Sequence, residues 1–215
     1  MMRIETERLI IRNWEERDRA LFHRINSDDE VMRFFGFRRT RAMADAFMDK
    51  LQTENAARGY GFAALELRES GEAIGMAGLK TTSDVPLRQP ESVEIGWRLA
   101  PEHWRKGYVT EAAEALLRYG FETLGLSEIV SFAVWNNDAS LAVMRRIGMS
   151  HVDGGDFDHP AVPDTSPELK RHVLYVLSRD EWCKRADNRL PERRIAPLNP
   201  SEWSRSAVRP SWTRA

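Results

Sequence analysis

The sequence contains a single cysteine, Cys183, and no long apolar run. One cysteine excludes an internal disulfide and a cysteine-ligated zinc site, which fits a reducing compartment. No stretch approaches the roughly 20 apolar residues that a membrane-spanning helix needs, and the first residues lack the apolar segment of a secretory signal. We therefore expect a cytoplasmic protein that makes no contact with a membrane.

The chain also has little net charge, with a formal value of −1, so it is not an obvious binder of nucleic acid. The charge is uneven, because residues 184–215 hold eight Lys or Arg and three Asp or Glu. These residues also include four prolines, so we interpret them as a basic extension, extended or disordered, after a domain spanning 1–183. Trp203 and Trp212 leave open a contact with RNA or the ribosome, although a solvated tail is the favoured interpretation.

Residues 1–183 show the hydrophobic patterns of short strands and helices. Ala44, Phe47, Met48 and Leu51 have helical spacing, which predicts a helix over 41–55. Segments typical of strands lie at 8–14, 60–69, 73–81, 92–100, 127–135 and 171–178. This order of strands and helices predicts one mixed α/β domain, in which antiparallel hairpins lead into a parallel β-α-β unit.

The stretch His103–Ala112 combines cations and a glycine at the start of a predicted helix. The first turn of a helix presents unpaired N–H groups and a partial positive charge. Gly107 lets a ligand approach the backbone closely, and Arg105 and Lys106 add full charges. Together these features can seat a pyrophosphate, although they also suit an ordinary helix start with solvated cations.

The segment from Ser92 to Met149 resembles the acetyl-CoA-binding core of the GNAT superfamily of N-acetyltransferases. In particular it resembles the RimJ/RimL type, which acetylates ribosomal-protein N-termini, and the likeness covers about Arg3 to Arg179. The resemblance implies a single α/β (α+β mixed) domain whose mostly antiparallel central sheet is splayed at a parallel strand pair and flanked by about four helices. It also implies acetyl-CoA as cosubstrate and a primary amine as acceptor, either a protein N-terminus or a small cationic amine.

The family's turn pattern, Q/R-x-x-G-x-G/A, stands here as residues 104–109, with Val109 where Gly or Ala is usual. The resemblance implies that the amides of residues 105–110 hold the pyrophosphate. It also implies that the strand SVEIGW contacts the pantetheine and the thioester carbonyl, although Trp97 equally suits sheet packing. The residues expected to bind the cofactor are Ile95, Gly96, Trp97, Arg105, Lys106, Gly107, Tyr108, Val109, Thr110, Asn137 and Ser140.

Acetyl transfer to an amine needs a base, because a free α-amine titrates at about 8 and a lysine at about 10.4. Glu94 is the candidate base, and an ordinary strand carboxylate is the alternative. Asn137 and Ser140 match the family's N-x-x-S, but Asn137 equally suits a helix N-cap. Ser140 is the candidate acid; many relatives use a tyrosine where this chain has Met144, so Ser140, Tyr108 or water must replace it.

An acidic loop over residues 153–168 is expected either to line the acceptor pocket and attract a cationic amine or to be solvated. His159 is its single histidine, so we expect no metal site. The protein is expected to be a monomer or a homodimer. Val109 and Met144 also leave open a second function, a catalytically weak domain that senses CoA or acetyl-CoA.

Overall fold

The computed structural model of the chain describes residues 3–83, 85 and 92–189, with side chains described up to residue 185. Within these residues nine strands form one sheet in the order β1-β2-β3-β4-β5-β6-β9-β7, and β8 pairs with β9. The strands are β1 (Ile4–Glu5), β2 (Leu9–Arg12), β3 (Phe62–Leu67), β4 (Ala73–Thr82), β5 (Ser92–Leu99), β6 (Glu128–Val134), β7 (Ser150–His151), β8 (Phe157–Asp158) and β9 (Arg171–Ser178). Neighbouring strands are antiparallel except β5 and β6, which run parallel, as expected.

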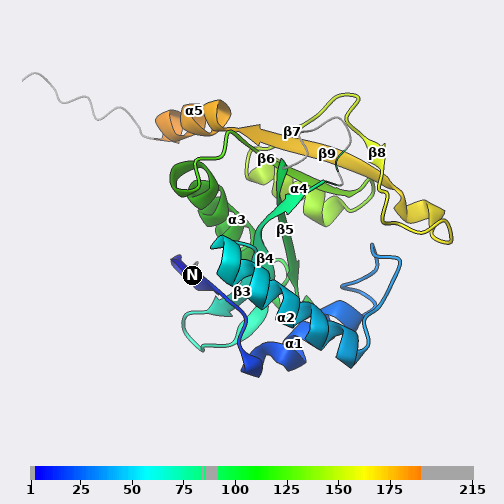
Figure 1. Ribbon diagram of the computed structural model, residues 1–215. Coiled ribbons are helices and arrows are strands. Elements are labelled where there is room, and N and C mark those ends of the chain that lie inside the picture. The colour runs from blue at the N-terminus through cyan, green and yellow to red at the C-terminus, as the bar shows by residue number, and fades with distance from the viewer. Residues whose placement is uncertain (1–2, 84, 86–91, 190–215) are drawn as a thin grey trace, which may run out of the picture.

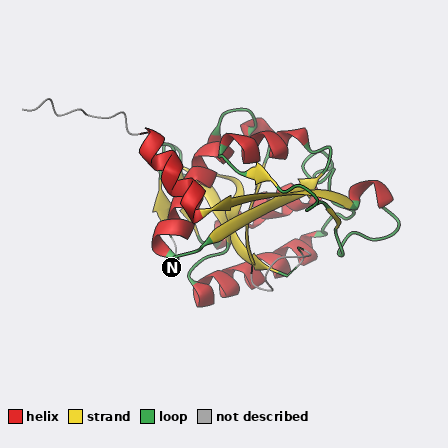
Figure 2. Cartoon of the chain, turned by 90° about the horizontal axis from the view of Figure 1, so that it is seen from above, coloured by secondary structure: helices red, strands yellow, loops and turns green. Residues whose placement is uncertain are grey.

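Helices lie on both faces of this sheet (Figures 1 and 2). The described residues form five α-helices: α1 (Arg19–Ser27), α2 (Arg41–Arg58), α3 (Tyr108–Arg118), α4 (Asp138–Arg146) and α5 (Arg179–Arg189). Short 3-10 helices occupy Glu16–Asp18, Pro101–His103 and Pro167–Leu169. Helices α1 and α2 pack on one face and α3 and α4 on the other, which confirms the expected single mixed α/β domain.

Helix α5 accounts for the difference from the expected four helices, and it crosses the domain boundary expected at residue 183. Residues 184–189 are helical rather than extended, which corrects that expectation. The helix is anchored by Trp182, whose ring lies 5.7 Å from that of Phe121. With a single apolar anchor among charged residues, the sequence of α5 shows almost no hydrophobic periodicity from which the helix could be predicted. The interpretation of residues 190–215, with their two tryptophans, falls outside the described residues.

Capping residues define the ends of the helix expected over 41–55, which is confirmed as α2. The Thr40 hydroxyl accepts a first-turn N–H at 3.3 Å, and Gly59 ends the helix with φ at 79°. Helix α3 ends at Arg118 and continues as one wider π-helical turn, Tyr119–Thr123.

The two faces of β5 belong to different hydrophobic cores. Ile95 and Leu99 are buried in the larger core, beneath α3 and α4. A smaller core beneath α1 and α2 contains Trp14, Phe22, Ile25, Ala44, Met48, Leu51, Ala64, Met76 and Ala100. Because successive side chains of a strand point to opposite faces, Glu94, Gly96 and Arg98 lie on the face that carries α1 and α2.

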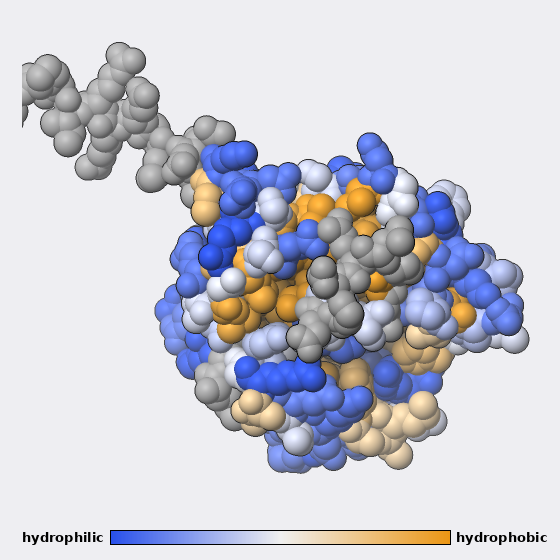
Figure 3. All heavy atoms as spheres, turned by 45° about the horizontal axis from the view of Figure 1, so that its top comes forward, coloured by the Kyte–Doolittle hydropathy of each residue, from blue (hydrophilic) through white to orange (hydrophobic). Residues whose placement is uncertain are grey.

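The visible face in Figure 3 is mostly hydrophilic, with apolar side chains gathered in a central area. Among the described residues, the large apolar side chains that remain exposed are Phe35, Phe37, Met43 and Trp135. No helix in this part of the chain combines the length and the apolarity needed to cross a membrane.

A buried ion cluster fastens β2 to β3 and to the start of α1. Arg12 donates to Asp18 and to Glu66, each at 2.7 Å, and all three side chains are at most 10% exposed. Burial by itself lowers the pKa of Arg12, but the hydrogen bonds to both carboxylates outweigh it and raise the pKa overall. Removing the guanidinium would leave the buried carboxylate of Asp18 without its cation, whereas Glu66 would keep Arg17 at 2.8 Å.

We expect Arg12→Met to lower the free energy of unfolding by about 3–5 kcal/mol, the usual cost of breaking a buried ion pair from one side. The matched control is Arg41→Met, which breaks an exposed i,i+4 pair with Asp45 and should cost at most about 0.5 kcal/mol. Urea unfolding of both variants measures the difference. Equal costs would contradict the structural role assigned to the cluster.

Candidate active site

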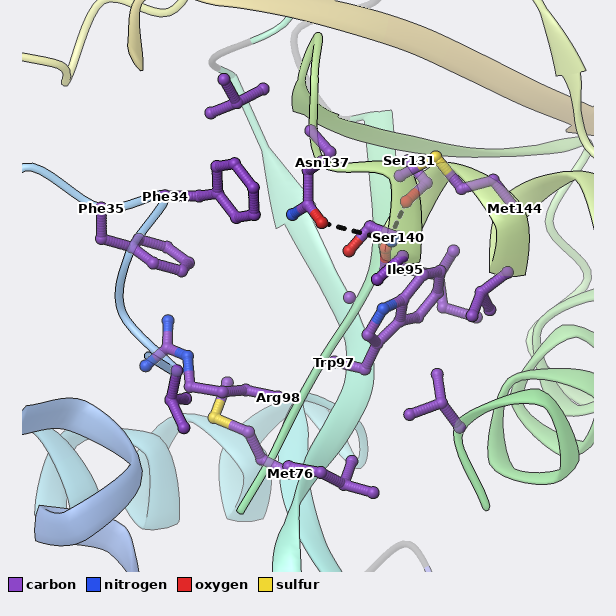
Figure 4. Close-up of a pocket in the computed structure, with 18 of the residues that line it drawn as sticks. Phe34, Phe35, Met76, Ile95, Trp97, Arg98, Ser131, Asn137, Ser140 and Met144 are labelled. Carbon is purple, nitrogen blue, oxygen red and sulfur yellow. Dashed lines mark hydrogen bonds between the residues drawn. The ribbon is translucent and has the colours of Figure 1, made fainter. Parts of the chain in front are cut away.

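The two parallel strands, β5 and β6, meet at one residue pair and then diverge. The pair is Glu94 with Val130. One residue further along, the Ser131 hydroxyl donates to the Ile95 carbonyl at 2.9 Å and closes the base of the gap (Figure 4). The expected splay at the parallel pair is therefore present, and Ser131, which the sequence did not single out, lies at its apex.

The direction of backbone groups along β5 follows from two hydrogen bonds. The Ala100 N–H donates to the Ile74 carbonyl in β4, whereas the Ile95 carbonyl accepts from Ser131 of β6. Because the two edges of a strand alternate with each residue, even-numbered residues direct their backbone groups to β4 and odd-numbered residues direct theirs to β6. Trp97, whose neighbour in β6 has diverged, therefore turns its N–H and its carbonyl into the gap.

A cleft of about 1760 Å³ opens from this gap. It is larger than the roughly 300–1,000 Å³ of a single-ligand pocket, so it has room for two substrates. Of the residues expected to act in catalysis or cofactor binding, all but Lys106 line it: Glu94, Ile95, Gly96, Trp97, Arg105, Gly107, Tyr108, Val109, Thr110, Asn137 and Ser140. The structure thus brings segments of three different elements to one place.

The turn before α3 has the backbone conformation of an anion-binding turn. Arg105 and Gly107 both have positive φ, at 60° and 81°, in the left-handed region. The first hydrogen bond of the helix joins the Glu111 N–H to the Gly107 carbonyl at 3.1 Å, so the N–H groups of residues 108–110 have no acceptor within the helix. These donors border the cleft and can receive a phosphate group.

Arg8, which the sequence analysis did not assign, holds this turn in place. Its guanidinium donates to the Lys106 carbonyl at 3.0 Å and to Glu111 at 2.6 Å, and it lies over the Tyr108 ring at 4.8 Å. The Thr6 hydroxyl also donates to Glu111, at 2.6 Å. Burial tends to raise the pKa of Glu111, but the hydrogen bonds from Thr6 and Arg8 lower it overall, so the carboxylate stays charged.

The start of α4 contributes further polar groups on the α3 side of the cleft. Asn137 is the N-cap, and its side-chain oxygen accepts the Ser140 N–H at 3.3 Å, so the capping alternative is confirmed. Ser140 borders the cleft one turn from Met144, which is buried and has no proton to donate (Figure 4). Val109 both lines the cleft and packs on the larger core, so its branch does not fill the turn.

The acidic loop does not place its carboxylates in the cleft. Only its uncharged residues and one histidine reach it: His159, Ala161, Val162 and Pro163. Asp156 bonds His151 at 2.7 Å, and Asp164 bonds Lys170. Arg171 donates to Asp156 as well, so Asp156 and Asp164 each have a cationic partner outside the cleft. Across the described residues, no group of three His, Cys, Asp or Glu side chains is arranged to hold a metal.

A buried histidine forms the far wall of the cleft. His172 lines it beside His159, with ring centroids 4.8 Å apart, and its Nδ1 contacts the Lys170 carbonyl at 2.8 Å. Burial lowers the pKa of His172, so the imidazole is neutral near pH 7. The alternation of apolar and polar residues in β9 does not indicate that His172 lines a cleft, because the wall is formed only when β9 pairs with β6.

Residues 8–150 match the family described as acetyltransferase (GNAT) domain. The chain belongs to the GNAT acetyltransferase family. The uncharacterized N-acetyltransferase YnaD of Bacillus subtilis is 34% identical over 185 residues, covering 84% of this chain and 99% of that protein. FsC-acetyl coenzyme A-N(2)-transacetylase of Aspergillus fumigatus is 29% identical over 185 residues, covering 84% of this chain and 78% of that protein. A GNAT-family acetyltransferase from Bacillus anthracis superposes with a TM-score of 0.69 at 27% identity, covering 84% of this chain and all of that one.

This GNAT protein is therefore an acetyl-CoA-dependent acyltransferase, as expected, with acetyl-CoA as its cosubstrate. The site fits that molecule on two observations. The left-handed turn leaves helix N–H groups free to meet a diphosphate, and the gap beyond Glu94 exposes strand amides to a chain lying in it. Membership of an acetyltransferase family favours catalysis over the alternative function, a domain that only senses the coenzyme, which Val109 and Met144 had left open.

We expect Gly107→Ala to weaken CoA binding about tenfold or more, because a left-handed residue with a Cβ is strained by roughly 1–2 kcal/mol and the turn must change to relieve it. The control is Gly59→Ala, which has nearly the same φ at the end of α2, away from the cleft. Both variants should lose similar stability in urea, but calorimetry should show weaker CoA binding only for Gly107→Ala. Undiminished affinity in that variant would contradict the role of the turn.

Proposed function

We propose that this GNAT enzyme is an N-acetyltransferase that moves the acetyl group of acetyl-CoA to a primary amine bound on the α1 and α2 side of β5. The observation that carries the proposal is the position of Glu94. It lies on that side of the strand, at the residue pair where β5 and β6 part, and its side chain is 14% exposed. The Glu94 carboxylate, as the proposed base, and the main-chain N–H groups of β5 thus border the same gap, the carboxylate from the α1 and α2 side and the N–H groups from the strand edge.

In this proposal the amides of residues 105–110 bind the pyrophosphate. Three observations support it: the left-handed Gly107, the unbonded donors of the first turn of α3, and the charge of Arg105 beside them. The side chain of Lys106 is not part of this proposal, because Lys106 does not line the cleft; Arg8 fixes the Lys106 carbonyl.

The gap between β5 and β6 would hold the pantetheine arm. Trp97 offers its main-chain groups there, and its indole covers the α3 side (Figure 4). The Asn137 oxygen is occupied by capping, so its contribution to the ligand is its amide N–H group. A strand N–H that points at the thioester oxygen stabilises the negative charge that develops there.

Starting from the ammonium, two protons must leave the nitrogen and one must reach the thiolate. Glu94 accepts the first proton, directly or through water, and releases it to solvent after the reaction; Lys80 holds the carboxylate from 3.9 Å. The amine nitrogen then attacks the carbonyl carbon, the C–N bond forms and the C–S bond breaks. The second proton leaves the nitrogen as the amide forms, and the thiolate, with an ordinary thiol pKa near 8.5, takes a proton from the Ser140 hydroxyl or from water, which regains one from the nitrogen.

The RimJ/RimL-like assignment and its acceptors, a protein N-terminus or a small cationic amine, are proposed on the sequence resemblance. The charges that line the cleft support a choice between them. Arg33, Arg39 and Arg98 line it near α1 and α2 together with Glu30, whereas no aspartate of the acidic loop is among the lining residues. These charges weigh against a polycationic acceptor and favour one whose only positive group is the reacting amine.

We expect Glu94→Gln to lower kcat at neutral pH by about 100-fold or more, the usual contribution of a positioned base. Much of the loss should be recovered as the pH approaches the pKa of the amine, because solvent then supplies the unprotonated nucleophile. Steady-state release of CoA thiol from pH 6 to 10 measures both effects.

The control for this experiment is Glu69→Gln, an exposed residue in the turn between β3 and β4 that removes the same charge away from the cleft. It should retain the rate and the pH profile of the parent enzyme. A Glu94→Gln variant with the parent profile would rule out Glu94 as the base.

A further inference from the structure

An arginine to which the described residues offer no carboxylate partner lies on the acceptor side of the cleft. Arg98 donates to the Asn26 side-chain oxygen at 2.7 Å, and its guanidinium lies over the Phe35 ring at 4.3 Å. Its Nε is buried and has no hydrogen-bond partner. No carboxylate of the described residues lies within ion-pair distance of this guanidinium, although the side chain lines the cleft.

A second arginine makes this charge less favourable still. Arg39 lines the same side, stacked on the Phe37 and Phe47 rings at 4.6 and 4.3 Å. Burial, together with the charge of Arg39, lowers the pKa of Arg98 to about 9. A desolvated arginine beside a second, partly buried one, with no counter-ion among the described residues, is costly unless a ligand supplies the anion.

The strand places Arg98 beside the reacting groups. Glu94, Gly96 and Arg98 follow one another along the same face of β5, so an acidic and a basic side chain flank a bare glycine. Two residues along a strand span about 7 Å, so an anion held by Arg98 lies close to an amine that reacts beside Gly96. A zwitterion with its ammonium toward Glu94 and its carboxylate toward Arg98 matches this pattern of charge.

The surroundings of Arg98 are apolar. Met76 lies directly opposite it in β4, and Figure 4 shows Phe34 and Phe35 on the same side of β5 as Arg98. Arginine's planar group pairs with a carboxylate through two parallel hydrogen bonds, and here it would do so in a place screened from water. The other face of β5, where Trp97 points, carries the coenzyme's elements, so the phosphates of CoA are not the missing anion.

We infer that Arg98 is a specificity-determining residue that binds the carboxylate of the acceptor, and that the acceptor is a free α-amino acid with an apolar side chain. This inference rests on the proposed acetyl transfer. It selects a small zwitterion over a protein N-terminus, whose carboxylate lies far from its amine. Phe34, Phe35 and Met76 then contact the side chain of the amino acid.

The test compares acceptors that differ only at the carboxyl group. L-leucine, L-methionine and L-phenylalanine are each assayed beside the corresponding carboxamide and a tripeptide beginning with the same residue, using the full chain and acetyl-CoA. We expect kcat/KM for the amino acids to exceed that for the amides and peptides by about tenfold or more, since an ionic hydrogen-bonded contact is lost. Equal values would overturn the inference.

Arg98→Gln supplies the second arm, because glutamine can still donate to Asn26 while losing the charge. We expect kcat/KM for the amino acids to fall about 10- to 100-fold, with the values for the amides nearly unchanged. Arg24→Gln, which removes an exposed arginine outside the cleft, should alter neither. An equal loss for amino acids and amides would assign Arg98 a structural role in holding Phe35 and Asn26.

Binding separates this inference from the proposed function. Saturation-transfer NMR of the CoA-loaded protein should detect the three amino acids with the parent enzyme but not with Arg98→Gln. Such binding without release of CoA thiol from any amine would support the carboxylate site while overturning acetyl transfer to a primary amine. Turnover of simple amines, with neither binding nor turnover of the amino acids, would overturn the carboxylate site alone.

Discussion

The parting of β5 and β6 is the constraint on which the rest of the site depends. Two parallel strands that stay side by side hydrogen-bond each other's backbone N–H and C=O groups. These two strands share one residue pair, so the main-chain groups of Trp97 face open space. Such groups cannot be buried without a partner, so the sheet must keep the gap accessible to water or to a ligand. Ser131 ends this exposure at the apex by bonding the Ile95 carbonyl.

The gap joins two surfaces of opposite character. On the α3 and α4 side, turns with unbonded N–H groups and the apolar face of Trp97 suit a long phosphorylated molecule. On the α1 and α2 side, Glu94 and Arg98 offer charges of both signs beside aromatic rings. Between the two surfaces β5 carries Gly96, where a Cβ would lie 3.1 Å from the Phe62 ring, so a larger residue at this position would displace that ring.

Local features of the site could be predicted from the sequence, and long-range ones could not. The turn at Gly107 and the run from Glu94 to Trp97 were found because their chemistry resides in consecutive residues. Arg98 follows directly in the same strand, but its importance appears only when Asn26 and Phe35 are known to pack on it. The remaining omissions share this cause. Arg8 contacts the turn although 98 positions separate it from Lys106 in the sequence, and the partners of the acidic loop lie outside the loop itself: His151, Lys170 and Arg171.

The approach of two loops over the acceptor side has a kinetic consequence. At Gly36, between α1 and α2, an added methyl group would lie 3.2 Å from the Ser166 hydroxyl and 3.3 Å from the Pro163 ring. Gly36 and Pro163 both border the cleft, so the two loops touch at its margin. A molecule passing between them would need the loops to separate, and loop opening of this kind limits turnover in many enzymes independently of the bond-making step.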